Sequence, residues 1–586
     1  MKTLKIVLIA ILIGVSHTSV SQNKYTEKDI RIIPKPANLL IKEGKFQFTN
    51  KTQFVVKGKD QIEIATALIG KFETATGWKP QIATKTPKSN FIQFRVDKNL
   101  NREAYKLVVV PSHIIITAKE NTGFIYALES IRQLLPEAIE SKVVVSNVKW
   151  QIPSIVIKDE PRFQWRGLML DLSRHFFDMS YIKKTIDRLA MLKMNVLHLH
   201  LVDDQGWRIE IKKYPKLTDV GAWRVDQENL AWNARLSVNP DQKGTYGGFL
   251  TQKELKEIVK YAQLKNVEII PEIEMPAHVS SAIAAYPELA CFDQRIGVPS
   301  GGVWPITDIY CAGKESTFEF LQNVLDEVIT VFPSKYIHIG GDEATKTNWE
   351  KCPLCQKRMQ DEGLKNVHEL QSYFVKRMEK HIISKGKKLI GWDEILEGGL
   401  APEATVMSWR GTKGGVEAAG QGHDVVMTPE SHCYFDHFQG PQNEEPIAIG
   451  GYTPISKVYE FDPVVSTMSP AEVQHVLGGQ ANLWSEFIPT TQQSEYMVFP
   501  RVVALSEALW SPKEVRNYSD FINRLPSILK RYDYQGLNYA KSAYLVTPTL
   551  TVDSNKKTVK MTLKNEFPKT DIRYILRDKN TESNAL

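Results

Sequence analysis

Two adjacent carboxylates, Asp342 and Glu343, follow an apolar run and two glycines in the stretch "YIHIGGDEATKTNW". An apolar strand that stops at glycines presents the next polar side chains at its carboxyl end, where α/β folds bind their ligands. Two neighbouring carboxyl groups resist double ionisation, so ionisation of one raises the pKa of the other. A carboxyl group that keeps its proton near neutral pH can act as a general acid. The pair therefore predicts acid–base catalysis.

Polar residues also end seven other apolar runs along the chain. Most of them are carboxylates, Trp or Tyr, and this mixture suits a sugar, whose C–H faces stack on indoles and whose hydroxyls bond charged groups. A phosphate site would instead require Gly-rich loops or helix N-termini with Lys and Arg. The pattern predicts a carbohydrate site. The residues at these seven ends are Asp171, Arg174, His200, Asp203, Asp204, Glu272, Glu274, His278, Trp392, Asp393, Glu394, Trp409, Arg410, Tyr434, Asp436, Trp484 and Glu486.

The eight apolar runs alternate with amphipathic helical patterns over about 350 residues, which predicts an α/β fold with a (β/α)8 TIM barrel. Barrel strands are shielded by the outer helices, so they read as nearly continuous apolar runs. A doubly wound open sheet is the alternative, but no G-x-G-x-x-G motif opens a helix after an early strand. The predicted strands are residues 166–173, 195–202, 267–274, 336–340, 388–392, 404–409, 424–428 and 476–484.

Four parts are predicted along the chain. Residues 1–22 carry two lysines, an apolar stretch and small residues, as in a signal peptide, so we expect a chain exported to the periplasm or the medium without a membrane anchor. Residues 23–157 mix short β-branched runs with helical periodicity and predict a small α+β domain. The barrel occupies residues 158–515. Residues 516–586 predict a helix followed by a short strand-rich segment, which is too small for a sandwich of its own and either packs on the barrel or forms an incomplete module.

The five cysteines and the net charge bear on partners and metals. The charge of +7 is not concentrated in any basic run, so nucleic acid is not a predicted partner. Cys291 and Cys311 flank a Gly- and Pro-rich loop that a disulfide could close. Cys352 and Cys355 form "CPLC", for which bracing or a local disulfide is expected, because zinc needs about four ligands and no second pair exists. The state of Cys433 stays open, and neither a cofactor nor a metal is predicted.

Four motifs, "HLHLVDDQGWRIEI", "PEIEMPAH", "HIGGDE" and "LWSE", resemble those of the family 20 glycoside hydrolases, the exo-acting β-N-acetylhexosaminidases. The resemblance extends over roughly residues 31–536, and it implies a small α+β domain before a (β/α)8 barrel. It also implies hydrolysis of terminal, non-reducing β-linked N-acetylglucosamine or N-acetylgalactosamine. In that family the 2-acetamido oxygen of the substrate is the nucleophile, and an oxazolinium intermediate forms with retention of configuration.

The resemblance also implies a role for each site residue. Glu343 would protonate the leaving oxygen and then activate water, while Asp342 would hold the acetamido N–H. An ionised Asp342 is then expected to raise the pKa of Glu343, so that Glu343 carries a proton near neutral pH. Glu274 and Ala277 depart from the more usual "EIDMPGH" of the family, which leaves the contact of the longer Glu274 arm open. The other implied roles are sugar hydroxyl binding for Arg174, Glu486 and Asp436, a charge relay for Asp204, Glu274 and His278, a pocket wall for Trp392, Trp409 and Trp484, and an acetamido hydrogen bond for Tyr434.

Two other functions compete with this interpretation. His198 and His200 form an H-x-H pair on one strand, as in metal-dependent amidohydrolases, but such sites need further His ligands where this chain has Trp, Asp and Glu. A non-catalytic glycan-binding barrel is the second alternative, and the intact pair of Asp342 and Glu343 argues against it. The preferred sugar, the natural aglycone and the oligomeric state are left open by the sequence.

Overall fold

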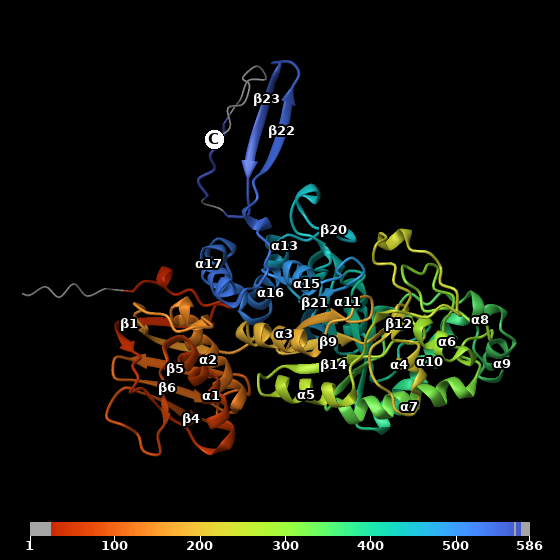
Figure 1. The fold of residues 1–586 in the computed structure, drawn as a ribbon, viewed down its shortest axis with the longest axis horizontal. Coiled ribbons are helices and arrows are strands. Elements are labelled where there is room, and N and C mark those ends of the chain that lie inside the picture. Colours follow the sequence, from red (N-terminus) through yellow and green to blue (C-terminus); the bar gives the residue numbers. More distant parts are fainter. Residues whose placement is uncertain (1–24, 568–569, 576–586) are drawn as a thin grey trace, which may run out of the picture.

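The computed structural model describes residues 25–567 and 570–575 of the chain (Figure 1). The predicted signal peptide, residues 1–22, lies outside the described residues. Within them an N-terminal domain is followed by a barrel and a C-terminal helix and hairpin. No described helix combines the length and the apolar character needed to cross a lipid bilayer.

The N-terminal domain is a seven-stranded mixed sheet with the strand order β1-β7-β5-β6-β4-β2-β3. Helices α1 (Gly58–Thr76) and α2 (Asn121–Leu134) pack on each other and share one hydrophobic core with the sheet. This arrangement confirms the predicted α+β domain. The strands are β1 (Asn38–Gln47), β2 (Gln53–Val55), β3 (Gln81–Ile82), β4 (Phe91–Val96), β5 (Tyr105–Val110), β6 (His113–Ala118) and β7 (Gln151–Asp159).

Eight parallel strands close into the predicted barrel. Every observed strand overlaps one of the eight predicted runs, so the predicted fold class is confirmed. Parallel strands need long crossover connections, and the helical stretches between the runs provide them. The strands in barrel order are β8 (Trp165–Asp171), β9 (Val196–His200), β14 (Glu268–Glu272), β15 (Tyr336–His338), β16 (Lys388–Trp392), β17 (Thr405–Ser408), β18 (Val425–Met427) and β21 (Val476–Leu483).

Side-chain caps fix the first residues of two of the main helices around the barrel. Asp178 caps α3 by accepting a hydrogen bond from Tyr181 N, and Thr251 and Glu254 form a capping box at the start of α5. Their apolar faces are buried against the strands. These helices are α3 (Met179–Met191), α5 (Gln252–Gln263), α7 (Glu315–Val331), α10 (Val367–Ser384), α11 (Lys413–Gly420) and α16 (Arg501–Trp510).

Shorter elements are inserted in the connections between the strands and these helices. The short strands are β10 (Val202–Asp203), β11 (Gly206–Trp207), β12 (Trp223–Arg224), β13 (Tyr246–Gly247), β19 (His437–Phe438) and β20 (Gly450–Tyr452). The short helices are α4 (Lys216–Asp219), α6 (Ser280–Ala285), α8 (Thr347–Lys351), α9 (Pro353–Asp361), α12 (Glu430–Cys433), α13 (Ile455–Glu460), α14 (Pro470–Val473) and α15 (Thr491–Val498).

The C-terminal part has two distinct halves. Helix α17 (Tyr518–Gln535) is bound to the N-terminal domain, where Arg531 donates to the backbone oxygens of Gln133 and Leu135 at 2.8 and 2.6 Å. Strands β22 (Thr547–Asp553) and β23 (Thr558–Lys564) form an antiparallel hairpin that projects away from the barrel (Figure 1). Most of the hairpin side chains are exposed, so the short strands predicted here pair with each other and not with the barrel.

All five cysteines of the chain carry free thiols. The disulfides considered from the sequence, between Cys291 and Cys311 and within "CPLC", are therefore wrong. The statement that no second pair accompanies "CPLC" is also wrong in three dimensions. The connections after β14 and β15 fold against each other and bring Cys291, Cys311, Cys352 and Cys355 into one cluster.

Candidate active site

A cavity of about 290 Å³ lies at the carboxyl end of the barrel strands, where TIM-barrel enzymes carry their sites. Ten of the twelve residues to which the family resemblance assigns a role line this cavity, and the exceptions are Asp204 and Glu274. Its volume is at the low end for ligand pockets, which suits one sugar ring better than a chain. The predicted residues that line the cavity are Arg174, His278, Asp342, Glu343, Trp392, Trp409, Tyr434, Asp436, Trp484 and Glu486.

A larger cavity, of about 870 Å³, lies at the opposite end of the barrel. It is lined by residues that precede the strands, such as Gln164, Asn195 and Lys335, and by Glu103 of the N-terminal domain. In TIM barrels the amino-terminal end serves stability, whereas catalysis takes place at the carboxyl end. The larger cavity is therefore not the candidate active site. The smaller cavity is, because carboxylates and tryptophans converge on it.

The connection after β15 presents the two carboxylates in different environments. Gly340 and Gly341 have φ values of +68° and +102°, and a Cβ on Gly340 would collide with the carboxylate of Glu274 at 1.7 Å. Glu343 itself has φ = +50°, a left-handed conformation that a non-glycine residue rarely adopts and that is found at functional sites. Asp342 is only 7% exposed, whereas the Glu343 side chain is 36% exposed. The tight turn therefore separates two neighbouring carboxylates.

His278 connects this pair to two further aspartates. Its Nε2 lies 3.3 Å from Glu343 Oε2 and 3.7 Å from Asp342 Oδ2. Its Nδ1 lies 3.1 Å from Asp203 and 3.2 Å from Asp204. Burial lowers the pKa of His278, but the charge of Asp203 and the hydrogen bonds to its carboxylate neighbours outweigh burial, and the pKa stands well above its usual value. A charged imidazolium is thus held between four carboxyl groups.

The pKa values of the two carboxylates differ in the direction opposite to the one expected from the sequence. Burial raises the pKa of Asp342 to about 6, with His278 opposing and Glu343 adding to the shift. The hydrogen bond from His278 lowers the pKa of Glu343, although partial burial works against it. The expectation that Asp342 raises the pKa of Glu343 left out His278, whose positive charge is closer to Glu343 than to Asp342.

Arg174 is fixed from behind by carboxylates. Its Nη1 bonds Asp171 at 3.0 Å, its Nη2 lies 2.8 Å from Asp203, and Glu486 approaches Nη1 at 3.4 Å. The guanidinium also lies over the ring of Trp484, 5.1 Å from its centroid. Asp203 was predicted only as a strand-end residue and was given no role of its own, although it joins Arg174 to His278. The tandem aspartates of "HLHLVDDQGW" were the available signal, and the sequence did not show which of the two makes these contacts.

Aromatic rings form the walls of the cavity. The rings of Trp392 and Trp484 lie 5.7 Å apart at 49°, and those of Trp409 and Tyr434 lie 6.1 Å apart at 23°. Trp409 donates to Glu394 at 3.0 Å, a contact that the sequence did not predict. Within the described part of the chain, Trp392 Nε1 and the Oδ1 atoms of Asp342 and Asp436 are buried without a hydrogen-bond partner. Unpaired polar atoms beside aromatic faces fit the requirements of a carbohydrate.

Glu274 and Asp204 lie behind the wall of the cavity. Asp204 accepts hydrogen bonds from the backbone and side chain of Ser280 at 3.0 and 2.6 Å, which aim it at His278. Glu274 is fully buried beneath Gly340, and burial together with Asp342 holds its pKa well above the usual value. The residues that line the cavity but were not predicted are Glu430, His437, Ile449, Gly450 and Gly451, from the connections around β19 and β20.

The H-x-H pair lies in the barrel interior below the cavity. His198 Nε2 is 3.1 Å and His338 Nδ1 is 2.9 Å from Glu272, and His200 also bonds this carboxylate. All three imidazoles are completely buried, and none lines the cavity. A metal-bound water at this depth would not meet a substrate, so the arrangement does not favour an amidohydrolase mechanism.

Sequence models of known families match this architecture. The model of the glycosyl hydrolase family 20 catalytic domain matches residues 163–513, and that of domain 2 of the same family matches residues 29–160. The chain belongs to glycosyl hydrolase family 20. Its barrel is the family's catalytic domain, and the family resemblance inferred from the four motifs is confirmed.

Individual relatives agree with this assignment. A beta-hexosaminidase of Porphyromonas gingivalis is 44% identical over 518 residues, which cover 88% of this chain and 64% of that protein. The chain thus spans less than two thirds of that relative. A beta-hexosaminidase of Vibrio furnissii is 34% identical over 81% of this chain and 76% of its own length. The crystal structure of a family 20 exo beta-N-acetylglucosaminidase from Vibrio harveyi in complex with N-acetylglucosamine superposes with a TM-score of 0.77 at 30% identity, covering 88% of this chain and 79% of that one.

The raised pKa of Asp342 predicts a pH-dependent gain in stability when its charge is removed. A folded-state pKa of about 6 against 3.8 means that folding takes up a proton, so wild-type stability declines as the pH rises through this interval. We expect Asp342→Asn to be more stable than wild type at about pH 7.5, with a free energy of unfolding higher by about 1–3 kcal/mol and a higher unfolding temperature. The difference should vanish below about pH 4. Thermal unfolding at several pH values measures this, with the exposed Asp219→Asn as control. A variant less stable at every pH would contradict the assignment.

Proposed function

We propose that this chain removes terminal, non-reducing N-acetylglucosamine or N-acetylgalactosamine residues from β-linked oligosaccharides or glycoconjugates by substrate-assisted, retaining hydrolysis. The observation that carries the proposal is the small cavity in which Asp342 and Glu343 face three tryptophans. A cavity with room for one ring favours exo action, because the next sugar must remain outside. The names of the relatives agree, since each is a hexosaminidase or an acetylglucosaminidase.

The division of labour follows from the two carboxylate environments. Asp342, buried and with Oδ1 unpaired among the described groups, is placed to accept the acetamido N–H and to orient the carbonyl oxygen for attack on the anomeric carbon. Its negative charge then stabilises the positive charge of the oxazolinium ring. Glu343 is more exposed and lies nearer the mouth, where it can reach the leaving oxygen. One carboxylate therefore positions the nucleophile and the other transfers the proton.

Proton delivery by Glu343 depends on its partners. The pKa of Glu343 is lowered by His278, so a bare Glu343 would hold its proton poorly near neutral pH. A sugar ring that covers Glu343 removes it from water, and desolvation favours the neutral acid. When Glu343 then activates water it takes a proton back, so each turnover ends with the acid form of Glu343 next to the charged His278. Asp203 and Asp204 keep that imidazole oriented.

Arg174 supplies the fixed cation for the sugar hydroxyls. Because Asp171, Asp203 and Glu486 already hold its guanidinium, little conformational entropy remains to be lost on binding. Asp436 and Tyr434 also line the cavity and present further hydrogen-bonding groups. The tryptophans stack on the apolar faces of the ring and its acetamido group. This set selects a 2-acetamido sugar but does not distinguish the two epimers.

Glu343→Gln tests the catalytic assignment. The amide keeps the shape of the side chain but cannot donate a proton, so kcat on β-linked disaccharides should fall by about 10²–10⁴-fold with little change in KM. Substrates with a good leaving group, such as nitrophenyl glycosides, should lose less in the cleavage step. Steady-state assays of released monosaccharide measure both effects, with Glu350→Gln on the same connection as control. A kcat for Glu343→Gln equal to that of the wild type would overturn the role of Glu343 as the proton donor. If the wild type binds the sugar without hydrolysing any substrate, a non-catalytic glycan-binding barrel is favoured instead.

We also propose that the chain is exported to the periplasm or the medium. Lys2 and Lys5 followed by an apolar stretch from Ile6 to Val15 support this, because they have the order of a signal peptide. Mass determination of the N-terminus from the native host tests it. A mature chain starting near residue 22 is expected, and a mature chain that retains residues 1–22 would overturn the proposal.

A further inference from the structure

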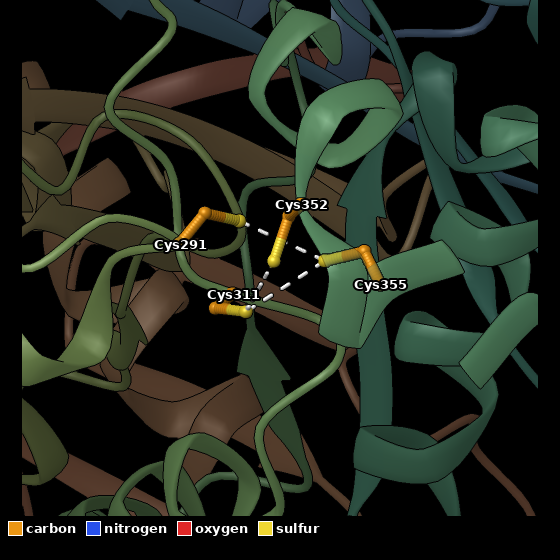
Figure 2. A group of neighbouring side chains, drawn as sticks. All are labelled: Cys291, Cys311, Cys352 and Cys355. Atoms are coloured by element: carbon orange, nitrogen blue, oxygen red, sulfur yellow. Dashed lines mark hydrogen bonds between the residues drawn. The ribbon is translucent and has the colours of Figure 1, made fainter. Parts of the chain in front are cut away.

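Four cysteine sulfurs converge on one point at the edge of the barrel (Figure 2). Cys291 follows the short helix at Pro287–Leu289, and Cys311 precedes α7. Cys352 is the N-cap of α9, and Cys355 lies in its first turn. Three of the four are completely buried and Cys291 is half-buried. Four thiols from three separate segments thus share one small volume with their sulfurs turned inward.

The spacing of the sulfurs matches a metal-centred tetrahedron. A tetrathiolate site with metal–sulfur bonds of about 2.3 Å has sulfur–sulfur edges of about 3.8 Å. The closest pairs here are 3.6 Å for Cys311 and Cys355, 3.7 Å for Cys291 and Cys355, and 3.9 Å for Cys311 and Cys352. All four sulfurs lie within 4.8 Å of one another. Disulfide pairs would instead approach to about 2.05 Å and would leave the two bridges farther apart.

We propose that Cys291, Cys311, Cys352 and Cys355 bind one structural zinc ion. This revises the expectation from the sequence that the chain has no metal site. The missing pair of ligands is not a second C-x-x-C motif but two cysteines that are far apart along the chain and meet only in the fold. Four protein ligands leave no open position for water, so the ion has no part in the hydrolysis itself.

The surroundings of the cluster have the features of a thiolate site. The backbone N–H groups of Gly313 and Lys314 face the Cys311 sulfur, where second-layer donors commonly lie around metal thiolates. Cys355 lies at the N-terminus of α9, where the helix dipole favours negative charge. Lys314 Nζ adds a positive charge and bonds the backbone oxygens of Glu288 and Ala290 at 2.9 and 2.7 Å, next to Cys291.

The backbone is shaped to let the ligands meet. A Cβ on Gly313 would lie 2.2 Å from the carbonyl carbon of Leu354 and 2.4 Å from the nitrogen of Cys355. Only glycine at this position allows the segment with Cys311 to rest directly on the "CPLC" turn. On the other side, Cys311 N donates to Leu289 O at 2.9 Å, which places Cys311 beside Cys291. These contacts bring the thiols together without a covalent link.

The zinc ion would join the two connections that carry the catalytic groups. Cys291 and Cys311 belong to the connection after β14, which also holds His278, and Cys352 and Cys355 belong to the connection after β15, which holds Asp342 and Glu343. Other contacts between the two include hydrogen bonds, such as Trp349 Nε1 to Tyr310 O at 2.9 Å. A metal cross-link would hold His278 against Glu343 at hydrogen-bonding distance. Zinc is favoured over iron because glycoside hydrolysis moves no electrons and a redox-inert ion is sufficient.

Metal analysis and thiol release on the full chain test the proposal. The protein, expressed with zinc in the medium and purified without chelator, should contain about one zinc ion per chain by elemental mass spectrometry. Titration with an organomercurial should release this zinc to a colorimetric chelator as the thiols are consumed. Cobalt(II) in place of zinc should give the intense visible bands of a tetrahedral thiolate site. Removal of the metal should lower the unfolding temperature by several degrees.

Variants locate the site and separate it from the other cysteine. Cys291→Ser, at the half-buried ligand, should lose most of the zinc and unfold at a lower temperature, while Cys433→Ser, outside the cluster, should keep one zinc ion. If Cys291→Ser does not fold, the mercurial titration of the wild type still decides. Two disulfides detected by intact mass, iron in place of zinc, or four free thiols with no metal under zinc-replete expression would each overturn the proposal. These outcomes leave the hexosaminidase assignment untouched, because that rests on Asp342 and Glu343.

Discussion

Two buried cations hold the site together. The carboxyl end of the barrel brings many acidic side chains close together. Their negative charges repel one another, and burial of an unpaired carboxylate costs free energy. Arg174 offsets Asp171, Asp203 and Glu486, and His278 offsets Asp203, Asp204 and Glu343. Asp203 belongs to both groups and couples them. The positions of Asp342 and Glu343, their pKa values and the shape of the cavity all depend on these two charges.

This constraint explains why the loops are built as they are. His278 can reach Glu343 only if the connections after β14 and β15 are held in contact, and the hydrogen bonds between them, together with the cysteine cluster, provide that contact. The positive φ of Glu343 and the close approach of Gly340 to Glu274 show that the turn is compressed against its neighbour. A strained turn of this kind persists only where the surrounding structure over-determines it. Structural rigidity at the barrel edge therefore serves the geometry of the site.

The fold was predictable because its signals are local. Eight apolar runs separated by amphipathic helices have few alternatives to a barrel, and the residues at their ends necessarily share one rim. The partners across that rim were harder to predict. Asp203 and Asp204 are identical in type and adjacent in sequence, and only the fold shows that Asp203 joins Arg174 to His278. The pKa order of Asp342 and Glu343 was predicted in reverse because it depends on a histidine 65 positions away from Glu343. The cysteine cluster was missed for the same reason, since its four ligands converge only through tertiary packing.

In the proposed mechanism the substrate's own acetamido oxygen is the nucleophile, and the reactivity of this oxygen can be varied directly. A series of nitrophenyl 2-acetamido-β-glucosides whose acetyl methyl group carries none, one, two or three fluorines makes that oxygen progressively less nucleophilic while leaving the leaving group unchanged. Substrate assistance predicts that kcat/KM falls steeply and monotonically along the series, because attack by this oxygen occurs in the rate-determining cleavage step. A value of kcat/KM that is independent of fluorination would contradict substrate assistance and point to a carboxylate of the protein as the nucleophile.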